Sequence, residues 1–514
     1  YRGIFGSHTA NVLRRLRRIC NFYGSSPIFI CCSATIANPG ELSQKLTGKP
    51  AVLIDENGAP AGEKNIIFYN PPVVNRQLGI RRSSLLEAKT IALNFLKNKI
   101  QTITFARSRL AVEVLLTYLQ EDMKKVAGAI NRIRGYRGGY LPKERREIEK
   151  GLREGEILGV VSTNALELGI DIGNLDASII TGYPGSVAST WQQAGRAGRR
   201  NSISASILVA SSSPLDQFII NHPEYFFKAS PEHGLINPNN LYILVSHIKC
   251  AAFELPFTDG ETFGGEHIDE ILAFLADEEI LRHVGGRWHW MAESFPAEEI
   301  SLRSASTENF VIIDITEGAK VIGEVDRSSA PMMIHEEAIY LHAGQQYQVE
   351  KLDYKEKKAY VRKVNVDYYT DANLAVEIKV LDVFKEKNVA NCQNYLGEVM
   401  VTSLATMFKK IKFFTHENLG FGHIHLPPEE LHTTAFWFSI PENIGRLSPE
   451  EIKSGLLGLC NVMVNIAPLY LMCDPRDIRG VVQIKSPFTQ KPTIYIYDNF
   501  PGGVGFSEKL YDME

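Results

Sequence analysis

The sequence lacks several features that mark secreted and membrane proteins. Its 514 residues contain seven cysteines but no CxxC pair, so no disulfide framework or strong zinc motif is evident. On the sequence alone, no apolar run is predicted to reach the ~20 residues that cross a bilayer. No apolar segment near Tyr1 indicates a signal peptide. These absences predict reduced thiols and a cytoplasmic protein without a membrane partner.

A strong positive charge is also absent. The net charge is −4, which does not indicate a nucleic-acid binder, although binding depends on local patches more than on the total. Two local basic clusters exist, and either could be a solvated helix face: Arg14, Arg15, Arg17 and Arg18; and Arg132, Arg134, Arg137, Lys143, Arg145 and Arg146. Cys460 and Cys473 are better explained as buried apolar cysteines than as zinc ligands.

Alternation of strands and helices dominates the first half of the chain. Apolar strands are predicted at 102–105, 157–162, 177–181 and 205–210, with helices at 86–98 and 109–124. This alternation is typical of an α/β domain with a doubly wound parallel sheet. Residues 27–35 are an apolar run that ends in Ser33, Ala34 and Thr35, which predicts a buried strand of another such domain.

The pattern changes after about residue 225. Two helical stretches and an aromatic hairpin indicate a winged helix, and period-2 alternation then indicates a small antiparallel β domain. We therefore expect five regions: the end of a first α/β domain at 1–70, a second α/β domain at 71–225, a winged helix at 226–300, a β domain at 301–379, and an α+β accessory domain at 380–514.

One motif follows the strand at 157–162 and reads STNALELGIDIG from Ser162 to Gly173. Thr163 lies just past the strand tip, where its hydroxyl and backbone N–H can hold a nucleic-acid phosphate. Gly169 permits close backbone approach, and Asp171 can accept a hydrogen bond from a ribose hydroxyl. The run predicts a binding loop, not an ordinary turn.

A second motif, QQAGRAGR, runs from Gln192 to Arg199. Arg196 and Arg199 are three residues apart, so both guanidinium groups can reach one anion. Such arginines stabilise the charge that develops on a transferred phosphoryl group. Gln192 can bind the nucleotide or the attacking water.

Together these motifs resemble motifs V and VI of superfamily 2 DEAD/DEAH-box helicases. The resemblance extends upstream, in the correct order, to Ser33 and Thr35 of motif III and to Arg107 and Ser108 of motif IV. It implies that Ser33 and Thr35 couple the nucleotide state to binding. It also implies that Arg107, Ser108 and, in the following segment, Arg137 contact nucleic-acid phosphates.

The later regions are similar to the bacterial mitomycin-repair-type helicases, relatives of the RecQ-like enzymes. The similar segments begin at Ala338, Val366 and Tyr495. The resemblance implies an ATP-dependent DNA helicase with RecA-like domains that moves 3′-to-5′ on single-stranded DNA and unwinds duplex DNA in repair. It also implies ATP and Mg²⁺ as cofactors, and a C-terminal zinc-binding domain.

The sequence departs from that family at both ends. It has no GxxxxGK[ST] loop and no Asp-Glu box to hold the phosphates and Mg²⁺. We expect an excerpt, with the Mg²⁺ ligands upstream of Tyr1 and any zinc ligands beyond Glu514, and we expect the isolated chain to be inactive as an ATPase. Two alternatives remain: an RNA helicase or remodeller, and a non-catalytic nucleic-acid-binding scaffold with a degenerate motor.

Overall fold

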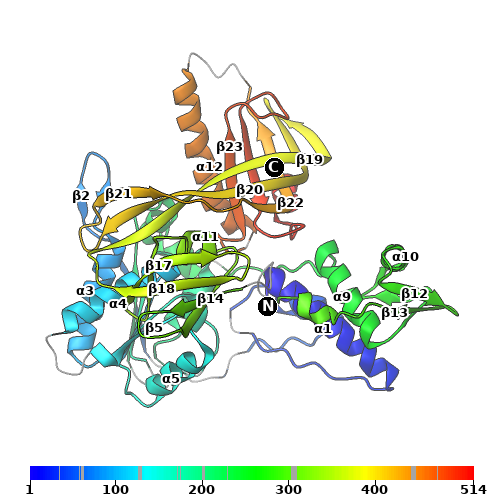
Figure 1. The fold of residues 1–514 in the computed structure, drawn as a ribbon, viewed down its shortest axis with the longest axis horizontal. Helices are drawn as coiled ribbons and strands as arrows, with labels where there is room; N and C mark the ends of the chain where they lie inside the picture. The colour runs from blue at the N-terminus through cyan, green and yellow to red at the C-terminus, as the bar shows by residue number, and fades with distance from the viewer. Residues whose placement is uncertain are drawn as a thin grey trace.

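The structure is a computed structural model. It describes residues 1–514 except 34, 57, 59–62, 125–129, 171, 174, 199–202, 229, 303–308, 442–446, 472 and 514, and except the side chains of 130 and 299. One lobe contains the motor domain and the small β domain, a second contains the C-terminal sheet with α12, and a third contains α1 with the winged helix (Figure 1).

The motor domain is built on a six-stranded parallel sheet with the order β1-β8-β7-β4-β6-β5. The strands are β1 (Lys64–Tyr69), β4 (Thr102–Phe105), β5 (Ile133–Tyr136), β6 (Gly159–Ser162), β7 (Ala177–Thr181) and β8 (Ser204–Val209). Its helices are α3 (Ser84–Lys97), α4 (Arg109–Met123), α5 (Pro142–Arg153) and α6 (Val187–Ala194). Every residue of β4, β6 and β7 is buried, which confirms the predicted doubly wound α/β domain.

Two predictions for the N-terminal region are wrong. β1 pairs with β8 in parallel, so it is an edge strand of this sheet and does not belong to another domain. Residues 27–33 form no strand, and the side chains of Ile28 and Ile30 are 90% and 88% exposed. An apolar run becomes a buried parallel strand only where neighbouring strands hydrogen-bond to it, and the described residues provide none here.

The N-terminal helices pack against the winged helix. α1 (Gly3–Phe22) contacts α2 (Pro39–Thr47) and α9 (Leu241–Glu254). Arg15 forms an ion pair with Glu254, and Arg18 pairs with Glu261 while donating to the carbonyl oxygens of residues 251, 255 and 256. The arginine cluster of α1 is therefore an interdomain contact and not a solvated face.

The winged helix consists of α9, α10 (Asp269–Asp277) and a three-stranded sheet. The sheet has the order β12-β13-β9, formed by β9 (Phe257–Thr258), β12 (Leu281–Val284) and β13 (Arg287–Trp290). A short hairpin, β10 (Thr262–Phe263) and β11 (Glu266–His267), precedes α10. Two short helices, α7 (Pro214–Asn221) and α8 (Pro223–Lys228), connect this unit to the motor domain.

A small β domain follows, with the sheet order β15-β14-β18-β17-β16 and a short helix, α11 (Ala330–Met333). Its strands are β14 (Asn309–Asp314), β15 (Lys320–Asp326), β16 (Ile339–His342), β17 (Gln345–Asp353) and β18 (Lys358–Val364). The predicted antiparallel pattern holds except between β14 and β18, which are parallel.

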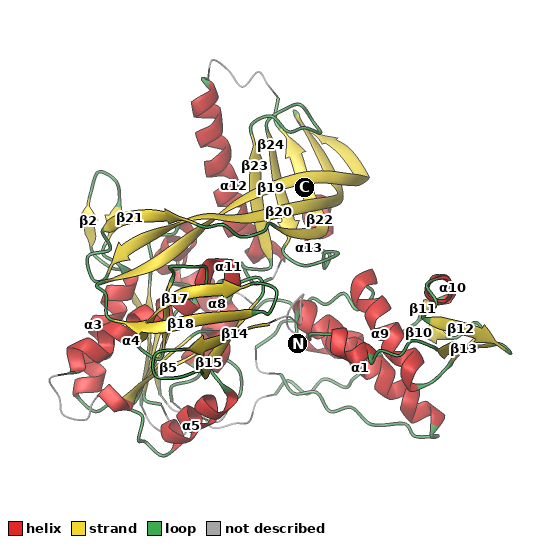
Figure 2. Ribbon diagram, viewed as in Figure 1, coloured by secondary structure: helices red, strands yellow, loops and turns green. Residues whose placement is uncertain are grey.

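The C-terminal sheet is connected to this domain by two very long strands, β19 (Tyr368–Val389) and β20 (Cys392–Lys412). They form one continuous ribbon that crosses the molecule (Figure 2). The predicted boundary at 379/380 is therefore wrong, because it falls inside β19. The sheet is completed by β21 (Asn418–His423), β22 (Glu429–Ser439), β23 (Ile478–Gln483) and β24 (Thr493–Asp498), with α12 (Pro449–Leu471) and α13 (Phe506–Asp512) beside it.

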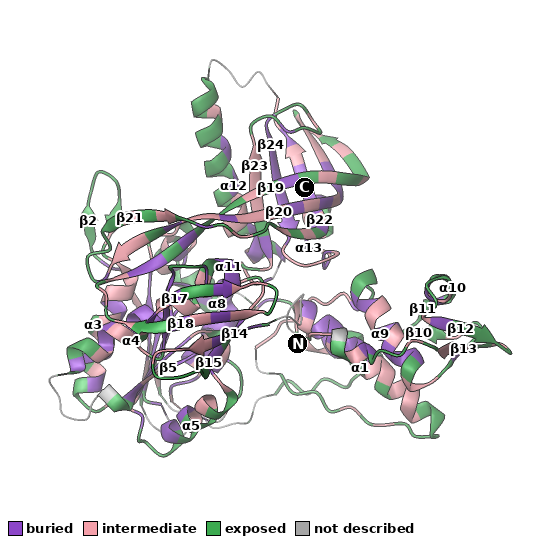
Figure 3. Cartoon of the chain, viewed as in Figure 1, coloured by how far each residue is buried: buried purple, intermediate pink, exposed green. Residues whose placement is uncertain are grey.

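α12 corrects the prediction about apolar runs. By length and composition it is sufficient to cross a membrane, and it is the one such helix among the described residues. This is a weak indication, because a core helix of a soluble domain meets the same criteria. One side of α12, which includes Leu456, Cys460 and Leu471, is buried beside β23 and β24, and the other is exposed (Figure 3).

Candidate functional site

The loops at the carboxyl ends of the motor-domain strands form one polar edge. Arg107 follows β4, Thr163 follows β6, and residues 182–186 follow β7. Because the strands are parallel, these three loops meet at the same end of the sheet, where ligands bind in open α/β folds. The structure therefore brings together two of the residues predicted to contact phosphates.

Arg107 is held in place at this edge. Its Nη2 donates to Tyr183 O at 2.6 Å and to Asp216 Oδ1 at 2.5 Å. The Asp216 carboxylate is 1% exposed, whereas the Arg107 side chain is 48% exposed. Asp216 Oδ2 also accepts from the backbone N–H of Ser211. The carboxylate thus lies behind a guanidinium group that remains open to a ligand.

The two hydroxyl residues of this edge are helix caps. Ser108 Oγ accepts from the backbone N–H of Ala111 at 3.1 Å and begins α4. Thr163 Oγ1 accepts from the backbone N–H of Ala165 at 3.4 Å and begins a short 3₁₀ turn at Asn164–Leu166. Capping uses a lone pair and leaves each O–H able to donate. Their predicted contacts with phosphate remain predictions.

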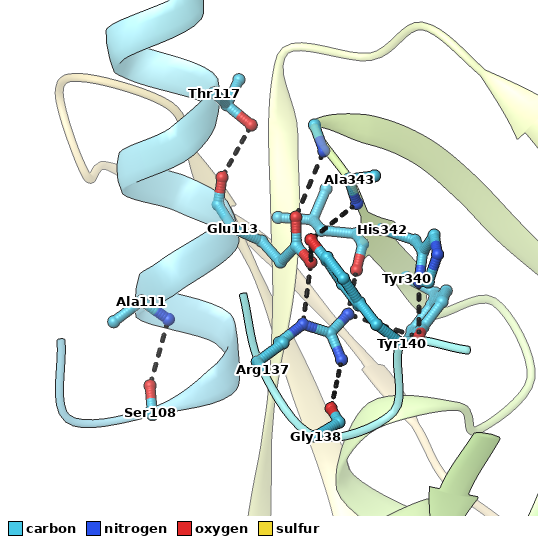
Figure 4. A network of polar contacts seen from close by, with 12 residues as sticks. Ser108, Ala111, Glu113, Thr117, Arg137, Gly138, Tyr140, Tyr340, His342 and Ala343 are labelled. Atoms are coloured by element: carbon cyan, nitrogen blue, oxygen red, sulfur yellow. Dashed lines mark hydrogen bonds and ion pairs between the residues drawn. The ribbon is translucent and has the colours of Figure 1, made fainter. Parts of the chain in front are cut away.

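Arg137 does not contact nucleic acid, contrary to the prediction. Its side chain is 0% exposed, and its Nε pairs with Glu113 Oε1 at 2.7 Å. Its Nη2 donates to Leu341 O at 2.8 Å, and Tyr140 and Tyr340 lie against it (Figure 4). Arg137 therefore fastens the β domain to the motor domain. A fully buried, ion-paired arginine cannot reach a phosphate.

The residues predicted to bind the nucleotide lie around α6 and in the loop after β6. Arg196 is almost fully buried, and its Nη1 donates to Ile170 O at 3.2 Å. Gln192 is half-buried on α6, and Gly169 is exposed with open space where a side chain would be. Arg199 and Asp171 lie outside the described residues, so the roles predicted for them are not examined by the structure.

The sequence analysis missed a buried network beside these residues. Glu167 Oε2 accepts from Ser189 Oγ at 2.6 Å and from Gln193 Nε2 at 2.9 Å, which ties the Thr163 loop to α6. Burial raises the pKa of Glu167, although Gln193 and Ser189 donate to it. Gln192 was the glutamine predicted to have a role in the site, but its neighbour Gln193 makes the buried contact with Glu167. The sequence pattern around the two glutamines does not show which one faces the interior.

Glu232 was also missed. Its carboxylate accepts from the backbone N–H groups of Val187 and Ala188, where α6 begins. A carboxylate at this position satisfies otherwise unpaired amides and complements the helix dipole. Glu232 thereby positions the helix that precedes Arg196.

Ser33 and Thr35 are not joined to this edge. Ser33 is exposed and Thr35 is half-buried, in a segment without regular structure. Among the described residues, no hydrogen bond or ion pair connects either side chain to the motor domain. Their predicted coupling role stays a prediction.

A doubly wound parallel sheet with a polar carboxyl edge, followed by a winged helix, defines a RecA-like motor of the superfamily 2 helicase class. Three family descriptions match the chain: Helicase conserved C-terminal domain at residues 87–201, the winged helix domain of ATP-dependent helicase HRQ1 at 236–305, and the MrfA Zn-binding domain at 459–514.

The chain is 60% identical to the uncharacterized ATP-dependent helicase YprA of Bacillus subtilis, over 99% of this chain and 68% of that protein. It is 30% identical to ATP-dependent helicase HRQ1 of Saccharomyces cerevisiae, over 100% of this chain and 50% of that one. A crystal structure of the DUF1998 helicase MrfA bound to DNA matches with a TM-score of 0.87 and 59% identity, covering 100% of this chain and 69% of that chain. The chain belongs to the MrfA/YprA family of ATP-dependent helicases.

The described residues do not form a zinc site, although the domain description that matches residues 459–514 is named for zinc binding. No three His, Cys, Asp or Glu side chains among them converge to hold a metal. Cys460 and Cys473 lie in an apolar cluster, and burial raises the pKa of both thiols, whereas zinc binds thiolate.

Proposed function

We propose that this protein uses ATP to move 3′-to-5′ along single-stranded DNA and to unwind duplex DNA during repair in the cytoplasm. The observation that carries the proposal is the open guanidinium group of Arg107 beside the Thr163 loop at one edge of a RecA-like sheet. The likeness to MrfA, which was solved with DNA and with DNA and AMPPNP, supports it. The direction and the repair role rest on the motif resemblance.

The carboxyl edge performs the binding step. Arg107 presents N–H donors to a backbone phosphate, and Thr163 adds its hydroxyl from the neighbouring strand. Contacts of this kind do not read bases. Binding is therefore expected to be largely independent of sequence and to weaken steeply with salt.

The residues around α6 perform the nucleotide step. Bound ATP supplies a phosphoryl group whose transfer to water releases the free energy for movement. The described residues supply only part of a nucleotide site, namely one arginine and one amide. Arg196 would stabilise the negative charge on the phosphoryl group, and the side-chain amide of Gln192 would donate a hydrogen bond to the nucleotide. The Glu167–Ser189–Gln193 network joins α6 to the Thr163 loop, so a shift of α6 would be transmitted to the phosphate contact.

ATPase activity of the full-length protein tests this proposal. Turnover is measured with single-stranded DNA, with single-stranded RNA and with neither, for the wild type, for Arg196→Ala and for Lys97→Ala. Lys97 is a matched control, because it is an exposed cation at the opposite end of the sheet, just before β4. We expect DNA to stimulate turnover, Arg196→Ala to reduce kcat by about 10³-fold or more, and Lys97→Ala to have no effect.

Other outcomes would change the proposal in distinct ways. Equal stimulation by RNA would indicate an RNA helicase or remodeller. No turnover in the full-length protein would indicate a non-catalytic scaffold. Strand displacement is then compared on duplexes with a 3′ or a 5′ single-stranded tail, and unwinding only from the 5′ tail would overturn the proposed direction.

A further inference from the structure

The C-terminal domain docks directly on the polar edge of the motor domain. Pro475, in the loop between α12 and β23, packs against Gly185, which has a φ of +100°. A Cβ at Gly185 would overlap the Pro475 ring. Gly182 plays a similar part for Arg107, because a Cβ there would lie 2.7 Å from Arg107 Nε. The loop after β7 therefore accommodates both Arg107 and the C-terminal domain.

A cavity of about 160 Å³, lined by both apolar and polar side chains, lies at this junction. Its charged and amide side chains are Arg107, Asn164, Gln193 and Asp216 on the motor domain, and Asn465, Asp474 and Arg476 on the C-terminal domain. At about 15 Å³ for each water position, the cavity has room on the order of ten waters. This is ample for a phosphate group.

Arg476 resembles Arg107 in its exposure and in how it is held. Its Nε and Nη2 donate to Asp474 Oδ1 at 2.9 Å and Oδ2 at 2.8 Å, and its side chain is 56% exposed. Among the described contacts, the hydrogen bonds of Arg476 use Nε and Nη2, and those of Arg107 use Nη2. Each Nη1 therefore has two N–H donors that none of these described hydrogen bonds uses. Two oriented guanidinium groups on one cavity suit a phosphate, which accepts hydrogen bonds on several oxygens.

We infer that Arg476 and Arg107 form one phosphate-binding subsite, through which the C-terminal domain contacts the backbone of single-stranded nucleic acid. This inference rests on the proposed function and extends it, because the track for nucleic acid then continues from the motor domain onto the C-terminal domain. Arg476 contributes a backbone contact, so its effect is the same for every base sequence.

Equilibrium binding of the full-length protein to fluorescent oligothymidylate, without nucleotide and at several salt concentrations, tests the inference. The variants are Arg107→Ala, Arg476→Ala, Asp474→Asn and Arg479→Ala. Arg479 is the matched control, since it is an exposed arginine three residues further on that does not line the cavity. Melting temperatures show that each variant is folded.

We expect Arg476→Ala and Arg107→Ala each to weaken binding several-fold. Each should also reduce the slope of log K against log salt by about 0.7, the value for one phosphate contact on a single strand. Asp474→Asn keeps one of the two oxygens that accept from Arg476 but removes the opposing charge, so it should tighten binding. If the Arg476–Asp474 pair only shapes the loop, Arg476→Ala and Asp474→Asn would instead change binding in the same direction.

Three results would overturn the inference, and they are distinguishable. If the wild type binds, Arg107→Ala weakens binding and Arg476→Ala behaves like Arg479→Ala, the shared subsite is wrong while the proposed function stands. If the wild type does not bind the oligonucleotide at low salt, the proposed function fails and the inference fails with it. A normal salt slope for Arg476→Ala would contradict a phosphate contact even if affinity fell.

Discussion

The motor domain contacts the rest of the chain at two polar joints that differ in their exposure to solvent. At the β-domain joint, Arg137 and Glu113 are completely buried and are surrounded by tyrosines and backbone carbonyls (Figure 4). At the C-terminal joint, Arg107 and Arg476 are about half exposed and line a cavity. Both joints use arginine–carboxylate pairs, and only burial separates a structural role from a binding role.

Burial also determines the energetic consequence of losing each pair. A buried charge that loses its partner is left in a medium that solvates it poorly, and this is strongly destabilising. An exposed pair contributes little to stability, because water solvates whichever partner remains. We therefore expect mutations at the buried β-domain joint to lower the free energy of unfolding, and mutations at the open C-terminal joint to lower ligand affinity.

The largest loss of stability is expected at the buried β-domain joint. Arg137→Ala leaves the Glu113 carboxylate buried without its cation, and we expect the free energy of unfolding to fall by about 3–5 kcal/mol. The double variant Arg137→Met/Glu113→Leu, which removes both charges, should recover much of this loss. Urea denaturation of both variants measures the difference, with Arg362→Ala as the exposed control, because the side chains of the Arg362–Glu350 pair are 48% and 41% exposed. A loss of less than about 1 kcal/mol for Arg137→Ala would contradict the distinction between the joints.

A smaller loss of stability is expected at the open C-terminal joint when one methyl group is added there. Gly185→Ala introduces a Cβ that overlaps Pro475 at a φ of +100°, and we expect a cost of about 1–3 kcal/mol. Because the joint is not fastened by buried charge, the C-terminal domain should separate from the motor domain without global unfolding. Hydrogen exchange at residues 473–479 should then increase.

Gly265→Ala is the control for this variant, because Gly265 has a similar φ of +92° and open space where its Cβ would lie. It carries the backbone strain without the interdomain overlap. Faster exchange at residues 473–479 in both variants, or in neither, would show that the Pro475 contact does not hold the joint.

The sequence predicted the central strands of the motor domain well, for a physical reason. β4, β6 and β7 are buried on both faces, so they appear as short uncharged runs of apolar, small and β-branched residues. β5 was not predicted, because it is a short edge strand that contains Arg134 and Gly135. Residues 27–33 have the same pattern as a central strand but form none, because pairing depends on neighbours that a local pattern does not reveal.

In the candidate site, too, the sequence indicates features that depend on neighbouring residues but not contacts between residues far apart in the chain. The resemblance implied a phosphate contact for Arg107, and the structure places this residue two positions after β4 at the polar edge. The resemblance implied the same contact for Arg137, yet its partners Glu113 and Leu341 lie 24 and 204 residues away. Arg476 carried no signal at all, since its proximity to Arg107 arises only when the C-terminal domain docks.

The smallest predicted effect concerns a third joint, between α1 and α9, and it depends on pH. His8 Nδ1 and His247 Nε2 are hydrogen-bonded at 3.0 Å, and Arg15 lies near His247. Burial lowers the pKa of His247 to about 3, with further lowering from His8, Arg15 and Arg14, while burial lowers the pKa of His8. In the unfolded chain His247 takes up a proton near its ordinary pKa of 6.5, whereas the folded chain resists this until about 3.

Stability should therefore be lost as the pH falls from about 6.5 towards 3, by at most about 1.4 kcal/mol per pH unit for this one group. Urea denaturation at pH 7 and pH 5.5, followed by the fluorescence of the winged-helix tryptophans, measures the loss, and His247→Asn should reduce it. His267→Asn, which removes an exposed histidine of the same domain, should leave the loss unchanged. The guanidinium group of Arg137 in the β-domain joint stays charged throughout this pH range. The α1–α9 joint should therefore lose stability at a higher pH than the β-domain joint. An equal pH dependence in the wild type and in His247→Asn would show that the histidine pair does not make this joint sensitive to acid.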